Sequence, residues 1–356
     1  MSRTALVLAC AALAACARPA VVTSDPPSAE GAWPPGAWVR QATGTTTEFR
    51  SFSAPDERVA WAGGRGGVVA RTTDGGATWR ADSIAGAASL FVVGLHAVDA
   101  DTAVALGTHF DGGLAVAWRT TDGGRTWTET MRRAGEGVFF DGLAFWDARR
   151  GIAFGDPVGG RFMIALTDDG GRTWRDAPRD AIPPVREGEA AFAASGGALG
   201  VRAGGRAWIG TGGAGTARVF HTSDWGRTWS VADTPLPANR TSGIFGLAFA
   251  DDRSGVAVCG DYAQPSADAP NVMRTEDGGR TWTIVGSSRP AGVRYGVALV
   301  GSDARLVASG PSGTGWSGDG GRTWTAIDTV AVNLVRATSG GTVWGAGVRG
   351  LIVRSR

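Results

Sequence analysis

The apolar residues of this chain fall into short runs separated by clusters of glycine, aspartate and serine. Short apolar runs bounded by turn-forming residues predict β-strands, and no long stretch shows helical periodicity. With 57 glycines and 15 tryptophans in 356 residues, the composition also fits an all-β protein with tight turns. Two of the units have their apolar runs at Phe139–Phe145, Gly151–Phe154, Phe162–Leu166, Ile244–Ala250, Gly255–Cys259 and Val272–Arg274.

Each unit ends in an eight-residue pattern, Ser/Thr-x-Asp-x-Gly-x-Thr-Trp, which we call the octapeptide. Its tryptophans recur every 42 to 55 residues, a period that predicts one four-stranded propeller blade per repeat. The six copies are Thr72–Trp79, Thr120–Trp127, Thr167–Trp174, Thr222–Trp229, Thr275–Trp282 and Ser317–Trp324.

The residue types of the octapeptide predict a hairpin turn. Its aspartate can accept hydrogen bonds from backbone N–H groups, its glycine suits a positive φ, and its tryptophan can fill the space between sheets. An EF-hand needs further oxygen ligands and a distal glutamate, which are missing here. We therefore expect structural roles for Asp74, Asp122, Asp169, Asp224, Asp277, Asp319, Trp79, Trp127, Trp174, Trp229, Trp282 and Trp324.

The octapeptide resembles the Asp-box, or BNR repeat, of sialidases, sortilin-type propellers and photosystem II assembly factors. Over residues 37–356 the chain resembles the photosystem II stability/assembly factor-like group, in which segments like Gly188–Gly196 and Gly243–Phe249 are inner strands. The resemblance implies that each octapeptide joins the third and fourth strands of a blade, on the face away from the usual site.

The chain after the sixth octapeptide predicts three strands, at Val332–Ala337, Thr342–Gly345 and Leu351–Arg354, without a fourth. Ala37–Gln41 resembles a fourth strand that lacks a blade of its own. Closing a ring with these two ends removes free sheet edges. We therefore predict a single domain, 37–356, that is a propeller of seven blades; six or eight blades remain open.

The N-terminus is typical of an export signal. Met1–Arg3 is positively charged, Thr4–Ala15 is apolar but too short to span a membrane, and Leu13–Cys16 resembles a bacterial lipobox. The resemblance implies a signal peptide at 1–15, a lipid on Cys16, and a proline-rich tether over 16–36. Ala17 after the cysteine favours the outer membrane. Ordinary signal cleavage is the alternative.

Charge and motifs exclude several functions. The net charge is +2, and the arginines are interspersed with acidic residues, so we expect no nucleic-acid partner. Gly210–Gly215 fits G-x-G-x-x-G, but a strand rather than a helix follows it, which argues against a nucleotide. Three scattered histidines make a zinc site improbable. We expect a monomer without metal or cofactor, attached to the membrane only through its lipid.

The resemblance places candidate functional residues on the face opposite the octapeptides. Two carboxylates about 5–10 Å apart there could act as an acid/base pair, and tyrosine with arginines is similar to a sialidase site, although no Arg-Ile-Pro motif is present. Solvated loop residues and inter-blade ion pairs are the alternative. The catalytic candidates are Asp156, Glu189, Asp261 and Tyr295. The ligand-binding candidates are Arg50, His109, Asp141, Arg161, Glu187, Tyr262 and Arg294, and we expect His96 and Asp111 on the same face.

Three functions fit these observations. A binding or assembly module for a protein or glycan ligand follows from the rigid ring, the anchor and the absence of a recognised catalytic motif. A glycosidase follows from the carboxylates on one face, if they converge on a groove. A ligand sensor is a third possibility, because the propeller fold hosts all three functions.

Overall fold

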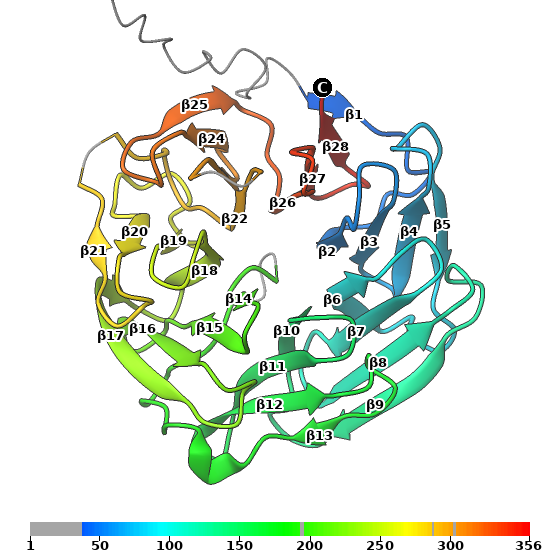
Figure 1. Cartoon of the computed structure of the whole chain (residues 1–356), viewed down its shortest axis with the longest axis horizontal. Coiled ribbons are helices and arrows are strands. Elements are labelled where there is room, and N and C mark those ends of the chain that lie inside the picture. Colours follow the sequence, from blue (N-terminus) through cyan, green and yellow to red (C-terminus); the bar gives the residue numbers. More distant parts are fainter. Residues whose placement is uncertain (1–37, 193–195, 287, 302–303) are drawn as a thin grey trace, which may run out of the picture. The chain divides into compact units, whose positions relative to one another are not determined.

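The computed structural model describes residues 38–192, 196–286, 288–301 and 304–356. Within this part of the chain, all regular structure is β-strand except for a single 3-10 turn at Arg179–Ala181. The strands form seven four-stranded antiparallel sheets arranged around one axis (Figure 1). The expected signal peptide, Cys16 and the tether lie outside the described residues.

Blades 1 to 6 each contain four strands in sequence order, counted from the inside outward. Blade 1 is β2 (Phe49–Ser53), β3 (Ala60–Gly64), β4 (Val68–Thr72) and β5 (Arg80–Ser83). Blade 2 is β6 (Leu90–Ala97), β7 (Ala103–His109), β8 (Leu114–Thr120) and β9 (Thr128–Ala134). Blade 3 is β10 (Phe140–Phe145), β11 (Gly151–Val158), β12 (Arg161–Thr167) and β13 (Arg175–Asp176).

Blades 4 to 6 repeat this order. Blade 4 is β14 (Leu199–Arg202), β15 (Arg206–Gly210), β16 (Gly215–Thr222) and β17 (Ser230–Ala238). Blade 5 is β18 (Ser242–Phe249), β19 (Gly255–Asp261), β20 (Val272–Thr275) and β21 (Thr283–Ile284). Blade 6 is β22 (Gly296–Leu299), β23 (Leu306–Gly310), β24 (Gly313–Ser317) and β25 (Thr325–Asp328).

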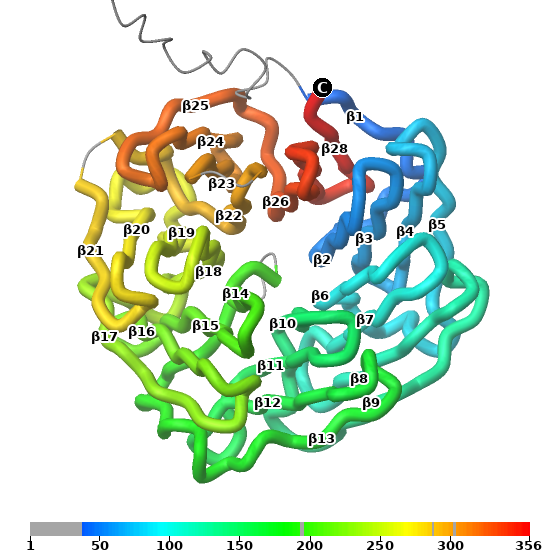
Figure 2. Tube along the Cα trace, in the orientation of Figure 1, coloured from blue at the N-terminus to red at the C-terminus, as the bar shows by residue number. Residues whose placement is uncertain are grey.

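Blade 7 combines the two ends of the described chain. It contains β26 (Leu334–Ala337), β27 (Val343–Ala346), β28 (Ile352–Ser355) and, outermost, β1 (Trp38–Arg40). Strand β1 pairs antiparallel with β28, with Trp38 opposite Ser355 (Figure 2). The inner strands contact one another in the order β2, β6, β10, β14, β18, β22, β26 and back to β2. The prediction of seven blades closed by an N-terminal strand is thus confirmed.

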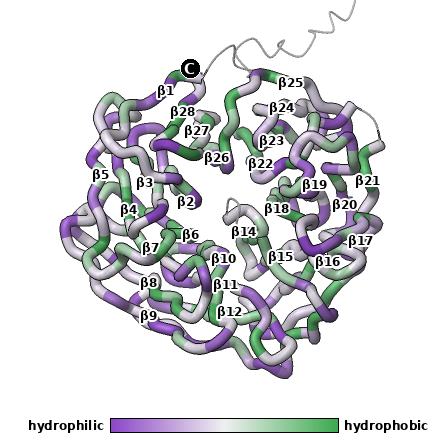
Figure 3. The backbone as a smooth tube through the Cα atoms, turned by 180° about the vertical axis from the view of Figure 1, so that it is seen from behind, coloured by the Kyte–Doolittle hydropathy of each residue, from purple (hydrophilic) through white to green (hydrophobic). Residues whose placement is uncertain are grey.

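The core lies between neighbouring blades. One buried cluster joins Trp61 and Val69 of blade 1 to Leu90, Val92 and Val116 of blade 2. Hydrophobic segments occur within the blades all around the ring, alternating with hydrophilic ones (Figure 3). Burying the side chains of both sheets in such layers supplies the main stabilisation of the ring.

The octapeptides form near-identical turns. In the second one, Asp122 Oδ1 accepts hydrogen bonds from the Thr126 N–H (3.0 Å) and the Thr120 hydroxyl (2.8 Å), and Asp122 Oδ2 accepts one from the Thr126 hydroxyl (2.6 Å). The third-position aspartate of each other copy accepts the same three bonds. The fifth-position glycines have φ between 77° and 93°, which is costly for other residues.

The octapeptide tryptophans pack between blades. Trp127 of blade 2 meets Trp61 of blade 1 edge-to-face, with 6.3 Å between ring centroids. Trp79 of blade 1 meets Trp344 of blade 7 in the same way, at 5.9 Å, across the junction that closes the ring. Trp229 is 7 % exposed and packs in one cluster with Phe154 of blade 3. In these three cases the tryptophan joins its blade to the blade before it.

One predicted inner strand is wrong. Residues 188–192 and 196 belong to no named strand, and β14 at Leu199–Arg202 takes the inner position of blade 4. Ala190 instead exchanges backbone hydrogen bonds with Gly212, in the loop between β15 and β16. Both segments contain small apolar residues, so the hydrophobic pattern could not distinguish them. A buried ion pair, described below, holds the segment in this place.

Candidate binding site on the loop face

The ring has two different faces. The octapeptide face contains the six octapeptides and the turns between first and second strands. The loop face contains the connections into each inner strand and the loops between second and third strands. Antiparallel topology places these two sets at opposite ends of every blade.

Several inner strands contain a β-bulge where they begin, at the loop face. The bulges leave one residue without a cross-strand partner, namely Arg50 in β2, Val93 in β6, Asp141 in β10 and Phe245 in β18. Bulges often redirect a side chain beside a functional site. Two of the predicted ligand-binding residues, Arg50 and Asp141, thus occupy equivalent positions in their blades.

Buried Asp141 and half-buried Asp156 stand on neighbouring strands of blade 3, close enough for the charge of Asp156 to act on Asp141. Asp141 is 1 % exposed, and its Oδ2 has no hydrogen-bond partner among the described residues. Burial, and then the negative charge of Asp156, raise the pKa of Asp141 well above its usual value. Burial also raises the pKa of Asp156 to about 6. Because two close carboxylates resist joint ionisation, we assign the retained proton to the more deeply buried Asp141.

Asp156 also contacts the chain segment that follows blade 3. Its Oδ1 accepts a hydrogen bond of 3.0 Å from the Ala191 N–H. This bond places residues 189–192 beside the two carboxyl groups. Asp141 lies beneath the surface, so in this conformation it is not placed to protonate a bound sugar, as a glycosidase acid must.

Glu189 is fixed by a buried ion pair with Arg218 of β16. The side chains of Glu189 and Arg218 are 1 % and 7 % exposed. Arg218 Nε donates to Glu189 Oε1 at 2.9 Å, and a second Arg218 nitrogen donates to Oε2. The Thr211 hydroxyl and the Arg186 N–H donate to the same carboxylate at 2.7 and 2.9 Å. With both oxygens satisfied, Glu189 anchors its segment to β16.

Sequence reasoning missed Arg218, although a signal was present. It is the one charged residue in the run Ala217-Arg218-Val219-Phe220, and a charge inside an apolar strand is buried only with a partner. Its partner could not be identified from the sequence, because Glu189 lies 29 residues earlier.

Four aromatic side chains pack into one cluster on the loop face, which we call the aromatic platform: Phe192, Phe245, Tyr262 and Tyr295. The Phe192 and Phe245 centroids are 5.0 Å apart, those of Phe245 and Tyr295 are 5.3 Å apart, and those of Phe192 and Tyr262 are 6.2 Å apart. Phe245 is buried beneath the others, whereas Tyr262 is 47 % exposed. The platform combines the segment after blade 3 with residues of blade 5 and the start of blade 6.

Tyr295 occupies the place in blade 6 that the bulged residues occupy elsewhere. Its N–H donates to Ser309 O at 2.7 Å, and Ser309 also pairs with the following Gly296. Burial raises the pKa of Tyr295, while the positive charge of Arg50 opposes the shift. Tyr295 is therefore a neutral phenol at physiological pH, unlike an activated nucleophile.

The other candidates serve local contacts. Asp261 accepts hydrogen bonds from Ala263 N (2.8 Å) and Asn239 Nδ2 (3.2 Å), and Arg50 pairs with Glu48 at 2.6 Å. Burial alone would raise the pKa of Asp261, but hydrogen bonds from Thr241 and Ala263 lower it. Buried Arg294 donates to Gly313 O and Ala291 O.

The remaining predicted residues do not join the platform through any contact described above. Arg161 donates to Ile182 O, Glu187 is exposed, and half-buried His109 ends β7. His96 is the penultimate residue of β6, which places it toward the octapeptide face. It stacks on Phe145 at 4.4 Å, and burial lowers its pKa to about 4.

Searches for a metal centre and a membrane span give no candidate in the part of the chain described. No three His, Cys, Asp or Glu residues there lie close enough together to hold a metal ion. Likewise, none of the described residues forms a helix with the length and apolar character needed to cross a membrane.

Comparison with known proteins places the chain by fold. No protein-family model and no curated sequence matches it. The structure is similar to that of YCF48 bound to a D1 peptide, with a TM-score of 0.63, 14 % identity, and coverage of 89 % of this chain and 94 % of that one. It is also similar to the WD40 propeller of Doa1, with a TM-score of 0.60, 12 % identity and coverage of 90 % and 97 %.

A third likeness is to a larger enzyme. The GH74 enzyme of Niastella koreensis matches with a TM-score of 0.61 and 16 % identity over 89 % of this chain, but only 53 % of the enzyme is covered. This chain thus spans about half the length of that enzyme. Such likenesses define the class of protein, a seven-bladed β-propeller, and at these identities they show the fold alone.

Proposed function

We propose that this protein is an exported, lipid-anchored propeller of the Asp-box type that binds another protein through its loop face. The observation that carries the proposal is the aromatic platform. It exposes Tyr262 beside the half-buried Phe192 and Tyr295, and partly exposed aromatic clusters are common binding hot spots. Meanwhile Glu189 is locked in an ion pair and Asp141 is buried, which leaves little for acid/base chemistry.

The favoured ligand is a peptide segment of a protein, with a glycan as the other ligand class. YCF48 is described with a bound D1 peptide, which supports peptide binding by a propeller of this shape. A peptide could lay an apolar or aromatic side chain on the platform and place polar groups over the neighbouring loops.

Peptide display on the purified propeller tests this proposal. Enriched peptides should bind the Tyr262→Ala variant at least about tenfold more weakly, because the variant removes exposed ring surface. The control is Phe110→Ala, which removes another exposed aromatic side chain, one that contacts Phe91 rather than the platform. Equal binding by wild type and Tyr262→Ala would reject the platform as the site.

A glycoside hydrolase is the second candidate function. The raised pKa of Asp156 suits a general acid, and GH74 enzymes share the fold. If this candidate holds, the wild type cleaves a xyloglucan oligosaccharide and Asp156→Asn reduces the rate by at least about a hundredfold. If the wild type does not cleave the oligosaccharide, the glycosidase candidate is rejected and the binding proposal is retained.

Lipid attachment at Cys16 is proposed from the N-terminal sequence. Cells expressing the full chain should incorporate labelled palmitate into the wild type and the Cys10→Ala variant, but not into Cys16→Ser. The Cys10 variant is the matched control because this cysteine lies within the expected signal peptide. Equal labelling of Cys16→Ser and the wild type would contradict lipid attachment at Cys16.

A further inference from the structure

In three of the six blades that carry an octapeptide, an arginine stands directly before it. It is Arg71 in blade 1, Arg119 in blade 2 and Arg274 in blade 5. Each guanidinium reaches the next blade: Arg71 donates to Ala100 O at 2.6 Å, Arg119 to Gly170 O at 3.2 Å, and Arg274 to Gly320 O at 2.7 Å. These arginines therefore bridge successive blades on the octapeptide face.

The other three blades have a different residue at this position: Leu166 in blade 3, His221 in blade 4 and Trp316 in blade 6. An imidazole is shorter than an arginine side chain. The Nδ1 atom of His221 is buried and has no hydrogen-bond partner among the described residues. The bond to the next octapeptide is made instead by Trp208 Nε1, which donates to Gly278 O at 2.8 Å.

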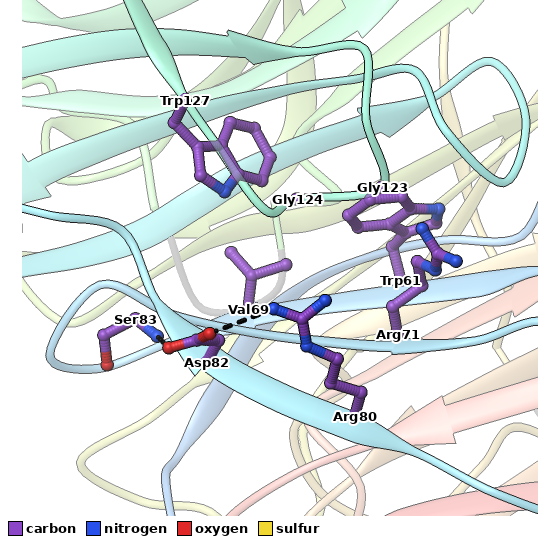
Figure 4. Close-up of a pocket in the computed structure, with 9 residues that line it drawn as sticks. All are labelled: Trp61, Val69, Arg71, Arg80, Asp82, Ser83, Gly123, Gly124 and Trp127. Atoms are coloured by element: carbon purple, nitrogen blue, oxygen red, sulfur yellow. Dashed lines mark hydrogen bonds and ion pairs between the residues drawn. The ribbon is translucent and has the colours of Figure 1, made fainter.

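A cavity beside His221 lies between blades 4 and 5. Its volume is about 390 Å³, within the range of small-molecule sites. At the junction of blades 1 and 2, Arg71 lies beside Trp61 and Gly123, and the space there is only about 20 Å³ (Figure 4). At the junction of blades 5 and 6, beside Arg274, the space is about 160 Å³, so the largest of the three spaces is the one beside the histidine.

The lining of this cavity is rich in hydrogen-bond donors. Its charged and titratable residues are Arg206, His221, Asp252, Arg253, Asp277 and Arg280. Arg206 pairs with Asp252 at 3.1 Å, and Asp277 is occupied by its own turn. Arg253 and Arg280 form no ion pair with a described carboxylate; they donate to the backbone oxygens of Glu276 and Asp277. Three guanidinium groups face two carboxylates, so the cavity has excess positive charge.

We propose that this cavity binds an oxyanion, a phosphate or a carboxylate group, between His221, Arg253 and Arg280. Guanidinium groups match the geometry of oxyanions and form charge-assisted hydrogen bonds with them. The buried His221 Nδ1 gains a partner when an N–H there donates to the anion. The site lies on the face opposite the platform, so it is independent of the proposed peptide site.

Imidazole NMR provides a direct test, since the chain contains three histidines. Burial and the charge of Arg280 lower the pKa of His221 in the unbound protein, while Asp277 opposes them. An anion in the cavity favours the protonated imidazole, so titration with inorganic phosphate should raise the pKa of His221 saturably. The resonances of His96 and His109 should stay unchanged.

Two variants sharpen the test, with binding measured by calorimetry using phosphate and, separately, acetate. His221→Arg copies blades 1, 2 and 5 and should fill the cavity, abolishing binding. Arg280→Ala copies Ala77 of the first octapeptide and should weaken binding at least tenfold. Arg125→Ala, the same position in the second octapeptide, is the control.

Saturable binding of phosphate or of acetate that His221→Arg abolishes supports the proposal, and the stronger of the two identifies the oxyanion class. The proposal is overturned if neither anion binds saturably. It is also overturned if Arg125→Ala weakens binding as much as Arg280→Ala does.

Discussion

The two faces of the ring use carboxylates in opposite ways. On the octapeptide face, six aspartates accept the same hydrogen bonds in six copies of one turn, and the strong donors around Asp74 lower its pKa to about 2. On the loop face, the carboxyl groups differ in environment: Glu189 is in a buried ion pair, Asp141 is buried, and half-buried Asp156 accepts a hydrogen bond from the Ala191 N–H. What repeats around the ring supports the fold, and what departs from the repeat is where function should be sought.

The largest expected effect is on the loop face. Arg218→Met should lower the free energy of unfolding by about 3–5 kcal/mol, because it leaves the Glu189 charge buried without its partner. Denaturant unfolding measures the loss. The matched control is Arg186→Met, which breaks the exposed pair with Asp233 at 2.9 Å on the same segment and should have little effect. Similar losses in both variants would contradict an anchoring role for the buried pair.

On the octapeptide face, Trp229→Ala should cost about 3–5 kcal/mol, since the ring is buried between blades 3 and 4. Trp174→Ala should cost less, because Trp174 is only partly buried. Thermal or chemical unfolding of the two variants gives the order. An unchanged melting curve for Trp229→Ala would remove the inter-blade role of these residues.

The pH dependence of stability should have opposite signs on the two faces. The folded pKa of Asp156 is raised, so the folded state binds more protons, and stability falls as pH rises from about 4 through 6. Asp156→Asn keeps an oxygen acceptor for the Ala191 N–H but cannot ionise. The variant should therefore avoid a loss of about 3 kcal/mol in the free energy of unfolding between pH 4 and pH 7.

The octapeptide aspartates give the opposite trend. The folded pKa of Asp74 is lowered, so its stabilising contribution is present above pH 4 and is lost as pH falls toward 2. Unfolding curves for Asp74→Asn should therefore differ from wild type at neutral pH and converge in acid. A stability difference that persists at pH 2 would contradict this assignment.

The smallest effect concerns the one octapeptide that departs from the pattern. Trp225 has φ of 67° where the other five copies have glycine, and this left-handed conformation costs about 1–2 kcal/mol. The ring compensates by packing against Arg150, 4.2 Å from its centroid, and edge-on against Trp146. Trp225→Gly should thus change the free energy of unfolding by less than about 1 kcal/mol. A larger loss would show that packing outweighs the strain.

Repetition made the fold predictable from the sequence. Six octapeptides gave the blade period, and the unmatched strand around Val39 indicated how the ring closes. The candidate site was harder, because its contacts join residues that no local pattern connects. Asp156 accepts a hydrogen bond from Ala191, and Glu189 forms an ion pair with Arg218. Arg50 and Asp141 each occupy a β-bulge. The apolar segment before β14 was predicted as a strand because small residues satisfy both arrangements.

The central claim, that a peptide binds at the loop face while the octapeptides hold the ring together, is tested most directly by one binding measurement. A peptide selected on the wild-type propeller is titrated into the wild type and two variants. Tyr262→Ala removes an exposed side chain from the loop face, and Arg280→Ala removes one from the octapeptide face. The account predicts at least about tenfold weaker binding for Tyr262→Ala and no change for Arg280→Ala. Loss of binding in Arg280→Ala alone would place the peptide site on the octapeptide face and contradict the account.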